Sequence, residues 1–559
     1  MSELYTVLSP WAETDNIEKL PLNPRLDTLE GKTIGLYASF KEYHPFFMQE
    51  VERQLAARYP TAKFSHYTYI VDTQEIDQDP ENFPIFKKWL EGVDAVIGVG
   101  ADMGSCALYM GYIFAQIERL GKPACLLSKY QYVPSASKGA SARSFPGLRM
   151  VTYDGPGFVP NGVDCNEWTI QVYRGKIAEM LDGMVDALTR PLTEEEKHPV
   201  SPKDYARETF TGTLTELTDQ FYRLGFTNGT PIIPPTEEAV AEMCRGTDLP
   251  RDHVVGRLPP RLGLATVEKI AINGVMAGCL PTYMPVLIAL VKAMLDPRIQ
   301  LEGYTCSRGS WGPVIILNGP IRHAVHINSG AGLLSPYDHA STTIARAMGL
   351  MVMNLSGVRP KLEDLCGMGH IGRFGTCIAE NEEDSPWPPL QTDFGFGEDD
   401  STVTLFWPSD TFYFRSRDAE KIPPEMCRGK DNGFDPGCGY ILCPEFAKTL
   451  ADAGWTKKKL LDYIVEYNRQ PASQVPIRWL RGNHHVPENI PLPMDPGESC
   501  RSFWTQDHMF VMVGGEGLGA GLLGGGDHGG PSCAKIELPA DWEALAAEYR
   551  DFVPHYVNY

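Results

Sequence analysis

The first third of the chain alternates short apolar runs with stretches in which apolar side chains recur at helical spacing. The apolar runs predict strands at Thr33–Ala38, Lys63–Ile70, Val93–Val99, Pro123–Leu127 and Leu148–Tyr153. The other stretches predict helices at Pro45–Tyr59, around Phe86–Leu90, and at Cys106–Leu120 and Gln171–Leu188. This alternation is typical of a parallel sheet with helices on both faces. We therefore expect an α/β fold that begins with a flavodoxin-like parallel-sheet domain over residues 1–190.

The pattern changes after a charged, proline-bearing stretch, Thr189–Asp204, which we interpret as an exposed linker. The remaining residues, 205–559, predict a larger α+β region in which two subdomains, 205–400 and 401–559, are an option. Helices are predicted at Val267–Ala277, Met284–Met294, His339–Met353 and Thr456–Tyr467, and strands at Pro313–Leu317, Thr402–Trp407 and Met509–Gly515. The segment Glu380–Gly397 is irregular. The Gly-rich segment after the last strand predicts a mobile lid or a pocket-lining loop.

Composition narrows the class of protein. With 559 residues, 43% of them hydrophobic, the chain is too long for one ordinary core. A net charge of -21 makes nucleic acid and anionic membrane poor partners, although a local Arg cluster could still hold an anionic substrate. The N-terminus shows no signal peptide, and the most apolar stretch is too short to cross a bilayer.

The thirteen cysteines are scattered without paired CxxC units, as is typical of reduced cytosolic thiols. We expect a cytoplasmic enzyme with a small-molecule substrate and no cofactor or metal, and homo-oligomerisation stays open.

The turn after strand Val93–Val99 is the strongest candidate for chemistry. Gly104 lets the backbone turn sharply, Ser105 is the predicted N-cap, and Cys106 falls in the first turn of the next helix. Ligands of open α/β sheets bind at this carboxyl end of the strands. A thiol at a helix N-terminus is favoured as the reactive thiolate, and the N–H groups there could stabilise an oxyanion. The alternative is a small residue that suits tight packing.

The segment Met103–Cys106 resembles the UGSC family of (seleno)proteins, in which a selenocysteine or cysteine, Gly, Ser and Cys follow a buried strand. Blocks of the second region also resemble long members of that family: Gly225–Val240, Ala265–Val286, Leu317–Gly332 and Cys377–Leu390. The resemblance thus covers most of the chain. Met103 stands where the family can carry a redox partner, and a thioether cannot form a disulfide with Cys106. Either another thiol resolves, or Cys106 acts as a covalent nucleophile, which we favour.

Further candidate residues lie in the second region. Cys306 precedes the strand Pro313–Leu317, beside Ser307 and Arg308, which could bind a carboxylate or a carbonyl oxygen, although a plain loop thiol is the alternative. A backbone nest that could hold an anion is predicted at Asn328, Ser329 and Gly330. The alternative is a loop that binds no ligand.

Acidic and histidine clusters are weaker candidates. Glu380–Glu383 is interpreted as a solvated acidic run, but the family resemblance makes Glu380 and Asn381 plausible site residues, with Glu380 as a general acid or base. His323 and His326 have metal-ligand spacing only if their stretch is helical, and its Gly-rich context, which extends to His339, favours a loop. Two isolated clusters have low priority, His484–His485 and Asp527–His528.

These observations predict a cysteine-dependent enzyme with its site between the two regions. Cys106 would attack a small electrophilic or sulfur-containing molecule, the amides around Gly104–Ala107 would form an anion hole, and a His or Glu from the second region would move protons. Two alternatives remain: a thiol-redox oxidoreductase that uses Cys106 with another thiol, and a non-catalytic small-molecule-binding protein.

Overall fold

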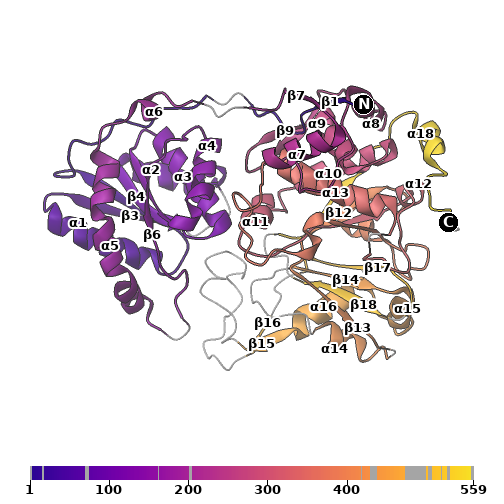
Figure 1. Ribbon diagram of the computed structural model, residues 1–559. Helices are drawn as coiled ribbons and strands as arrows, with labels where there is room; N and C mark the ends of the chain where they lie inside the picture. The colour runs from indigo at the N-terminus through magenta and orange to yellow at the C-terminus, as the bar shows by residue number, and fades with distance from the viewer. Residues whose placement is uncertain are drawn as a thin grey trace.

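A computed structural model describes residues 3–15, 18–69, 75–160, 163–200, 204–335, 337–416, 418–427, 437–471, 499–501, 506–517, 519–524 and 529–555. Two bodies are visible in Figure 1, an N-terminal one and a larger one formed by the rest of the chain. The sites His484–His485 and Asp527–His528 lie outside the described residues.

The N-terminal body is built on a five-stranded, all-parallel sheet in the order β3-β2-β4-β5-β6. Its strands are β2 (Thr33–Ala38), β3 (Lys63–Thr68), β4 (Ala95–Ala101), β5 (Ala124–Lys129) and β6 (Met150–Tyr153). Its helices are α1 (His44–Arg58), α2 (Asn82–Glu91), α3 (Gly104–Arg119), α4 (Val133–Ala142), α5 (Cys165–Thr189) and α6 (Glu194–Lys197). This is the flavodoxin-like strand order, in which the chain changes direction between β2 and β4. The expected α/β fold is confirmed.

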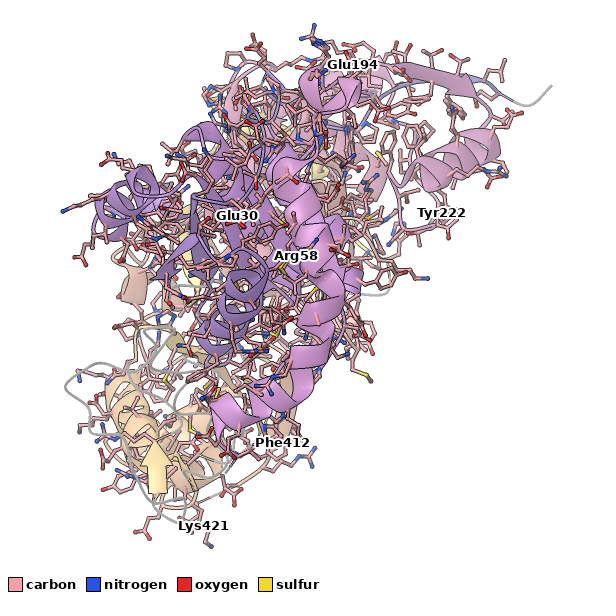
Figure 2. All side chains as sticks on the ribbon, turned by 90° about the vertical axis from the view of Figure 1, so that its left-hand side faces the viewer. Glu30, Arg58, Glu194, Tyr222, Phe412 and Lys421 are labelled. Carbon is pink, nitrogen blue, oxygen red and sulfur yellow. The ribbon has the colours of Figure 1, made fainter. Side chains whose placement is uncertain are left out.

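Apolar side chains cover both faces of this sheet. One face packs against α1 and α5 through side chains such as Phe47 and Ile177. The other packs against α2, α3 and α4 through Phe86, Phe114 and Ala136. Arg58 at the end of α1 pairs with Asp182 of α5 on the outside of the body (Figure 2).

Helix α4 is absent from the sequence-based prediction. Its sequence, VPSASKGASA, has few large apolar residues, so no 3.6-residue period stands out. Small residues instead let α4 approach α3: a Cβ on Gly139 would lie 2.2 Å from the Leu108 carbonyl oxygen. This close contact fixes α4 against the first half of α3.

The larger body contains two four-stranded sheets, β11-β10-β12-β19 and β13-β18-β14-β17. Their strands are β10 (Val314–Asn318), β11 (Thr376–Ala379), β12 (Thr402–Phe406), β13 (Asp410–Phe414), β14 (Cys438–Leu442), β17 (Met509–Val513), β18 (Ala520–Gly524) and β19 (Ser532–Lys535). Smaller two-stranded pairs are formed by β8 (Val254–Leu258) with β9 (Gly263–Thr266) and by β15 (Arg469–Pro471) with β16 (Ser499–Arg501). This body is mixed α and β, as predicted.

The helices of the larger body pack around these sheets. They are α7 (Leu214–Leu224), α8 (Glu237–Cys244), α9 (Val267–Ala277), α10 (Met284–Met294), α11 (Leu301–Cys306), α12 (Ile321–Ala324), α13 (His339–Asn354), α14 (Ile422–Met426), α15 (Pro444–Asp452), α16 (Lys457–Tyr467) and α18 (Trp542–Tyr549). In the part of the chain that the structure describes, no helix has the length and apolar character that a membrane span needs.

Two segments differ from the sequence-based interpretation. Part of the Gly-rich segment near the C-terminus is not a lid, because β18 pairs with β13 on one side and β14 on the other. Part of the expected linker is helical: Thr193 and Glu196 form a capping box at α6, and Glu196 accepts hydrogen bonds at 2.8 Å from the buried Arg149. The capping box and this ion pair hold α6 on the N-terminal body.

The N-terminal segment belongs structurally to the larger body, where β1 (Tyr5–Leu8) pairs with β7 (Thr209–Gly212). Lys269 of α9 donates hydrogen bonds at 2.7 Å to the carbonyls of Ser9 and Ala206. The chain therefore crosses between the bodies twice, once after β1 and once after α6. The domain boundary near residue 190 stays a prediction.

Candidate functional site

The carboxyl ends of β2, β4 and β5 carry a buried polar cluster, which we call the Asp102 cluster: Ser39, Lys41, Tyr43, His44, Asp102 and Lys129. It lies where the chain changes direction between β2 and β4, the position at which flavodoxin-like folds bind ligands. Sequence reasoning missed it, because its members lie up to ninety residues apart. The available signal was a polar residue directly after each of three buried apolar runs.

Asp102 is the centre of this cluster. Its Oδ2 accepts a hydrogen bond from the Tyr43 hydroxyl and lies 2.9 Å from Lys41 Nζ and 3.3 Å from His44 Nε2. Burial raises the pKa of Asp102, but the charge of Lys41 and the contact with His44 outweigh burial, so its pKa falls below the ordinary value. Asp102 is therefore a carboxylate at neutral pH.

His44 connects Asp102 to Ser39, whose Oγ lies 2.8 Å from His44 Nδ1. Burial lowers the pKa of His44, although Asp102 acts in the opposite direction. The imidazole is therefore neutral near pH 7, with one ring nitrogen toward a carboxylate and the other toward a hydroxyl. Such a ring is able to relay a proton.

The turn from β4 into α3 places Cys106 two residues inside the helix. Ser105 is not the N-cap as predicted: the backbone stays extended through Met103, which is the N-cap, and the helix begins at Gly104. Cys106 lies in the first turn of α3, as predicted, with 4% of its surface exposed. The amide of Ala107 donates to the Met103 carbonyl at 2.8 Å, so an anion hole would be limited to the amides before it.

Gly104 touches the larger body directly. A Cβ on Gly104 would lie 2.5 Å from the Cys306 carbonyl oxygen and 2.9 Å from Ser307 Cα, too close for any side chain. On its other side, Ser135 of α4 donates a hydrogen bond of 3.2 Å to the Gly104 carbonyl. The glycine of the motif is therefore a contact between the two bodies. Figure 1 shows α11 on the side of the larger body that faces α3 and α4.

Cys306 ends helix α11 and is fully buried, so the alternative of a plain loop thiol is wrong. Burial raises the pKa of its thiol, which therefore stays protonated at neutral pH. Glu302, one turn earlier in α11, has a pKa raised to about 7, mainly by burial. After the helix, Arg308 Nη1 donates to the Tyr132 hydroxyl at 2.9 Å and so ties this segment to the N-terminal body.

The comparison with protein families identifies the N-terminal part. Residues 6–161 match the model of the UGSC family. This part of the chain is therefore similar to the UGSC family. The match includes Gly104, Ser105 and Cys106 as well as the whole Asp102 cluster. No curated protein matches the chain.

The second-region blocks that resemble long UGSC members lie outside the matched residues, and the structure groups some of them around Glu380. Both carboxylate oxygens of Glu380 accept hydrogen bonds: Oε2 from Asn318 Nδ2 at 2.5 Å and the Leu390 amide at 2.7 Å, and Oε1 from the Val513 amide at 3.2 Å. Burial raises the pKa of Glu380. These donors give it a structural role between β10, β11 and β17.

The loop Asn328–Gly330 lies beside the same end of β17. Asn328 Oδ1 accepts a hydrogen bond from the Gly330 amide at 3.0 Å, and the Ser329 carbonyl accepts one from Gly515 at 2.8 Å. Asn381 Nδ2 donates to Asp384 at 3.0 Å. Backbone contacts bring the loop and the Glu380 segment to the same end of β17: the Ala379 amide donates to the Asn328 carbonyl at 3.4 Å, and the Asn381 amide donates to the Val513 carbonyl at 2.9 Å.

Only part of the acidic run Glu380–Glu383 is solvated as expected: Glu380 and Asn381 are buried, whereas Glu383 is exposed. Buried Arg322 lies 3.0 Å from Glu382 and 2.9 Å from Glu383, and Glu382 also accepts from the Gly319 amide at 2.7 Å. The run therefore wraps around one guanidinium, which the sequence alone does not indicate.

The three candidate histidines have separate partners. His323 Nε2 lies 3.0 Å from Glu383, His326 Nε2 lies 2.8 Å from the Arg550 carbonyl, and His339 Nδ1 lies 3.2 Å from the Tyr283 hydroxyl. Among the residues given above as described, no group of three or more His, Cys, Asp or Glu could hold a metal ion.

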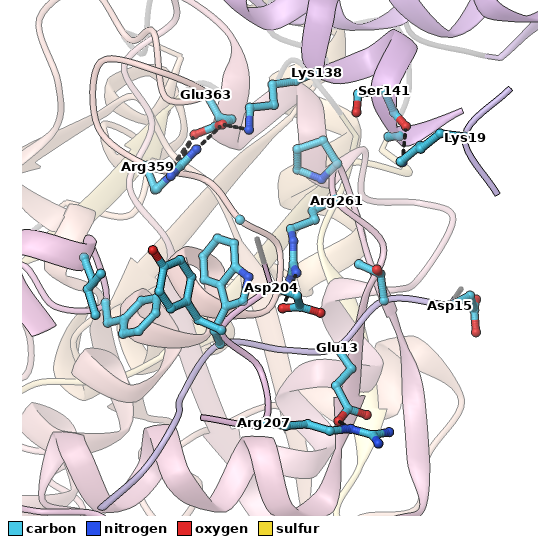
Figure 3. A pocket seen from close by; sticks show the side chains of 18 residues that line it. Glu13, Asp15, Lys19, Lys138, Ser141, Asp204, Arg207, Arg261, Arg359 and Glu363 are labelled. Carbon is cyan, nitrogen blue, oxygen red and sulfur yellow. Dashed lines mark hydrogen bonds and ion pairs between the residues drawn. The ribbon is translucent and has the colours of Figure 1, made fainter. Parts of the chain in front are cut away.

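A cavity of about 640 Å³ lies between the two bodies (Figure 3). Lys138 of α4 reaches it from the UGSC part and pairs with Glu363 at 3.5 Å, and Glu363 also pairs with Arg359 at 3.1 Å. Arg261 lies 4.2 Å from the centre of the Trp11 ring. Lys138 follows Ser135 by one turn of α4, so the cavity and the Gly104 contact lie along the same helix.

Proposed function

We propose that this protein is a cysteine-dependent enzyme in which Cys106 is a covalent nucleophile toward a small electrophilic or sulfur-containing molecule. One observation carries the proposal: Cys106 lies in the first turn of α3, at the strand ends where this fold binds ligands, directly after the Asp102 cluster. Helix N–H groups there favour a thiolate and a developing oxyanion. A small-molecule substrate and a cytoplasmic location belong to the same proposal.

The proposed step joins the Cys106 sulfur to the electrophilic atom of the substrate. The electron pair of the broken bond moves to the leaving group or to a carbonyl oxygen, which the first amides of α3 would face. His44 is neutral and lies between Asp102 and Ser39, so it is the proton carrier that we assign. Glu302 is the acid that the larger body offers, since its pKa is about 7.

A thiol-redox enzyme is the second candidate, and the Gly104–Cys306 contact favours it. In that reaction the Cys106 thiolate attacks a substrate disulfide and releases one thiol. Cys306 then displaces the second thiol and forms a Cys106–Cys306 disulfide, which an external dithiol reduces. Because burial raises the pKa of Cys306, it would act second.

The test is the mass of the intact protein after exposure to fractions of a cell extract or to candidate electrophiles. We expect an adduct that maps to Cys106 and is lost in Cys106→Ala. Cys125→Ala is the matched control, because Cys125 lies within β5 of the same sheet, where burial raises its pKa to about 12. An adduct that survives in Cys106→Ala contradicts the proposal.

Cys306→Ala separates the two candidate functions. The covalent mechanism leaves the adduct and the turnover unchanged in this variant. The redox mechanism predicts instead that turnover stops and that a Cys106 mixed disulfide accumulates.

A further inference from the structure

Lys129 is a largely buried lysine whose ammonium group forms no hydrogen bond or ion pair with the residues that the structure describes. It ends β5 with 4% of its surface exposed. Burial lowers its pKa to about 8, which still leaves the group mostly charged at neutral pH. A largely buried charge without a direct hydrogen bond or ion pair is unfavourable for the folded state, and a bound anion would supply that partner.

The ammonium group of Lys41 lies near the same backbone position, Gly157, as that of Lys129. A Cβ on Gly157 would lie 3.3 Å from Lys129 Nζ and 3.7 Å from Lys41 Nζ. Two carboxylates act on these lysines: Asp102, which lies 2.9 Å from Lys41, and Asp154, whose charge together with that of Asp102 raises the pKa of Lys129 against the effect of burial. Arg308 from the larger body is close enough that its charge lowers the pKa of Lys129 further. Lys41, Lys129 and Arg308 thus face Asp102 and Asp154, which leaves one positive charge in excess in a protein whose net charge is -21.

The second carboxylate oxygen of Asp102, Oδ1, is a free hydrogen-bond acceptor among the described residues. Oδ2 takes Tyr43, His44 and Lys41, whereas the buried Oδ1 has no hydrogen-bond partner among the described residues. A carboxylate oxygen in this state is an acceptor for an O–H or N–H group. An unpaired ammonium beside an unpaired acceptor matches a molecule that carries both a negative charge and a hydrogen-bond donor.

We propose that Lys129, Lys41 and Asp102 form the subsite that holds the oxyanion group of the substrate, a small carboxylate or phosphate that also bears a hydroxyl, amine or other donor. As a substrate subsite it rests on the proposed function, because it lies at the strand ends beside the Cys106 turn. The ammonium of Lys129 pairs with the oxyanion, and Asp102 Oδ1 accepts from the donor.

The experiment measures thermal unfolding and calorimetric binding of the full-length protein with three probes: glycolate, acetate and inorganic phosphate. Glycolate carries a carboxylate and a hydroxyl, acetate only the carboxylate. We expect wild type to bind glycolate more tightly than acetate. If phosphate binds more tightly than both carboxylates, the natural ligand is assigned as a phosphate. If either carboxylate binds more tightly than phosphate, the natural ligand is assigned as a carboxylate.

Lys129→Met is the decisive variant. We expect it to unfold at the same or a higher temperature than wild type without ligand, since it removes an unpaired buried charge, and to bind the anion at least about tenfold more weakly. Lys63→Met is the matched control, because Lys63 is an exposed lysine at the opposite end of the same sheet, and it should bind as wild type does. A Lys129→Met protein that binds normally, or that fails to fold, overturns the proposal.

Cys106→Ala distinguishes this inference from the proposed function. It should keep the anion response while it loses the covalent adduct. Loss of the response only in Lys129→Met, with no Cys106 adduct in wild type, would contradict the proposed function and leave the anion site standing. A Cys106 adduct in wild type, without any anion binding that depends on Lys129, would contradict the anion site and leave the proposed function standing.

Discussion

A single methyl group on Gly104 would be enough to disturb the contact between the two bodies. Since that Cβ would meet backbone atoms of Cys306 and Ser307 rather than a movable side chain, the neighbours cannot rotate away. We predict that Gly104→Ala destabilises the protein by about 1–3 kcal/mol, the usual range for overpacking. Chemical denaturation would measure the loss.

Gly175→Ala is the control for that substitution. Gly175 also lies in a helix, α5, but a Cβ there meets no atom within 4 Å. Because alanine favours a helix by about 0.5–1 kcal/mol over glycine, this variant should be as stable as wild type or more stable. Equal loss in both variants would show that the Gly104 contact is not tight.

Glu302 gives a second prediction for a single residue, a pH dependence. Its pKa is about 7 in the folded protein and 4.5 ordinarily, so the folded state binds more protons between these values. Stability should therefore decrease as pH rises from 4.5 to 7, by about 3 kcal/mol at most. Glu302→Gln removes this proton uptake, so it should lose less stability over that interval than wild type.

Urea unfolding of wild type and Glu302→Gln between pH 5 and pH 8 would measure the difference. Glu91→Gln is the control, because Glu91 is an exposed glutamate at the end of α2. Curves for Glu302→Gln that remain parallel to those of wild type at every pH would contradict the buried carboxyl.

At the scale of elements, one lysine contributes to holding the N-terminal strand on the larger body. Lys269 Nζ binds the carbonyls of Ser9 and Ala206, which flank β1 and β7. In Lys269→Met both carbonyls lose a charged donor. We predict that the β1–β7 pair opens more readily, by about 1–3 kcal/mol, and exchanges its amide hydrogens faster.

Hydrogen exchange of the peptide that spans residues 3–12, read by mass spectrometry, would test this. Lys292→Met is the control, since Lys292 forms a half-exposed pair with Glu537 at 2.9 Å, and such pairs contribute little. If the amide hydrogens of this peptide stay protected from exchange in Lys269→Met, the core packing of Trp11, and not Lys269, holds the N-terminal strand in place.

The elements that the sequence predicts well are those with a strong apolar period. Helices α9 and α10 begin and end at the predicted residues, and the strands of the parallel sheet are found within a few residues of their predicted bounds. Elements rich in small residues are missed: α4 depends on glycine contacts with α3, and β18 on pairing with β13 and β14. Their stability comes from tertiary partners that a local pattern does not contain.

The same limit applies to the candidate site. Placing Cys106 in the first turn of α3 needs only local sequence, and that prediction is confirmed. The partners of Asp102 come from two other strand ends, and the neighbour of Gly104 comes from residue 306. Strand order decides which of these residues meet, so the Asp102 cluster emerges only with the fold.

At the scale of the whole molecule, the two bodies are joined both by the polypeptide chain and by packing contacts. The chain crosses from one body to the other after β1 and again after α6. In addition, α3 of the N-terminal body packs on α11 of the larger body. Arg149 donates hydrogen bonds to the carbonyls of Arg190 and Pro191 and pairs with Glu196, so residues 190–197 belong to the N-terminal body. The part of the linker that Arg149 does not hold on the N-terminal body therefore begins after α6.

Limited proteolysis tests this arrangement. We predict a first cut after Lys197 rather than within 190–196, because a capped helix with a buried ion pair resists the local unfolding that proteases need. The nicked protein should still elute at the size of the intact chain, since β1 stays paired with β7 and Gly104 stays against Cys306. Urea should then release an N-terminal fragment, at lower concentration in Gly104→Ala than in wild type. A fragment that separates without denaturant, or a first cut between β4 and the end of α3, would contradict this account of how the two bodies are held together.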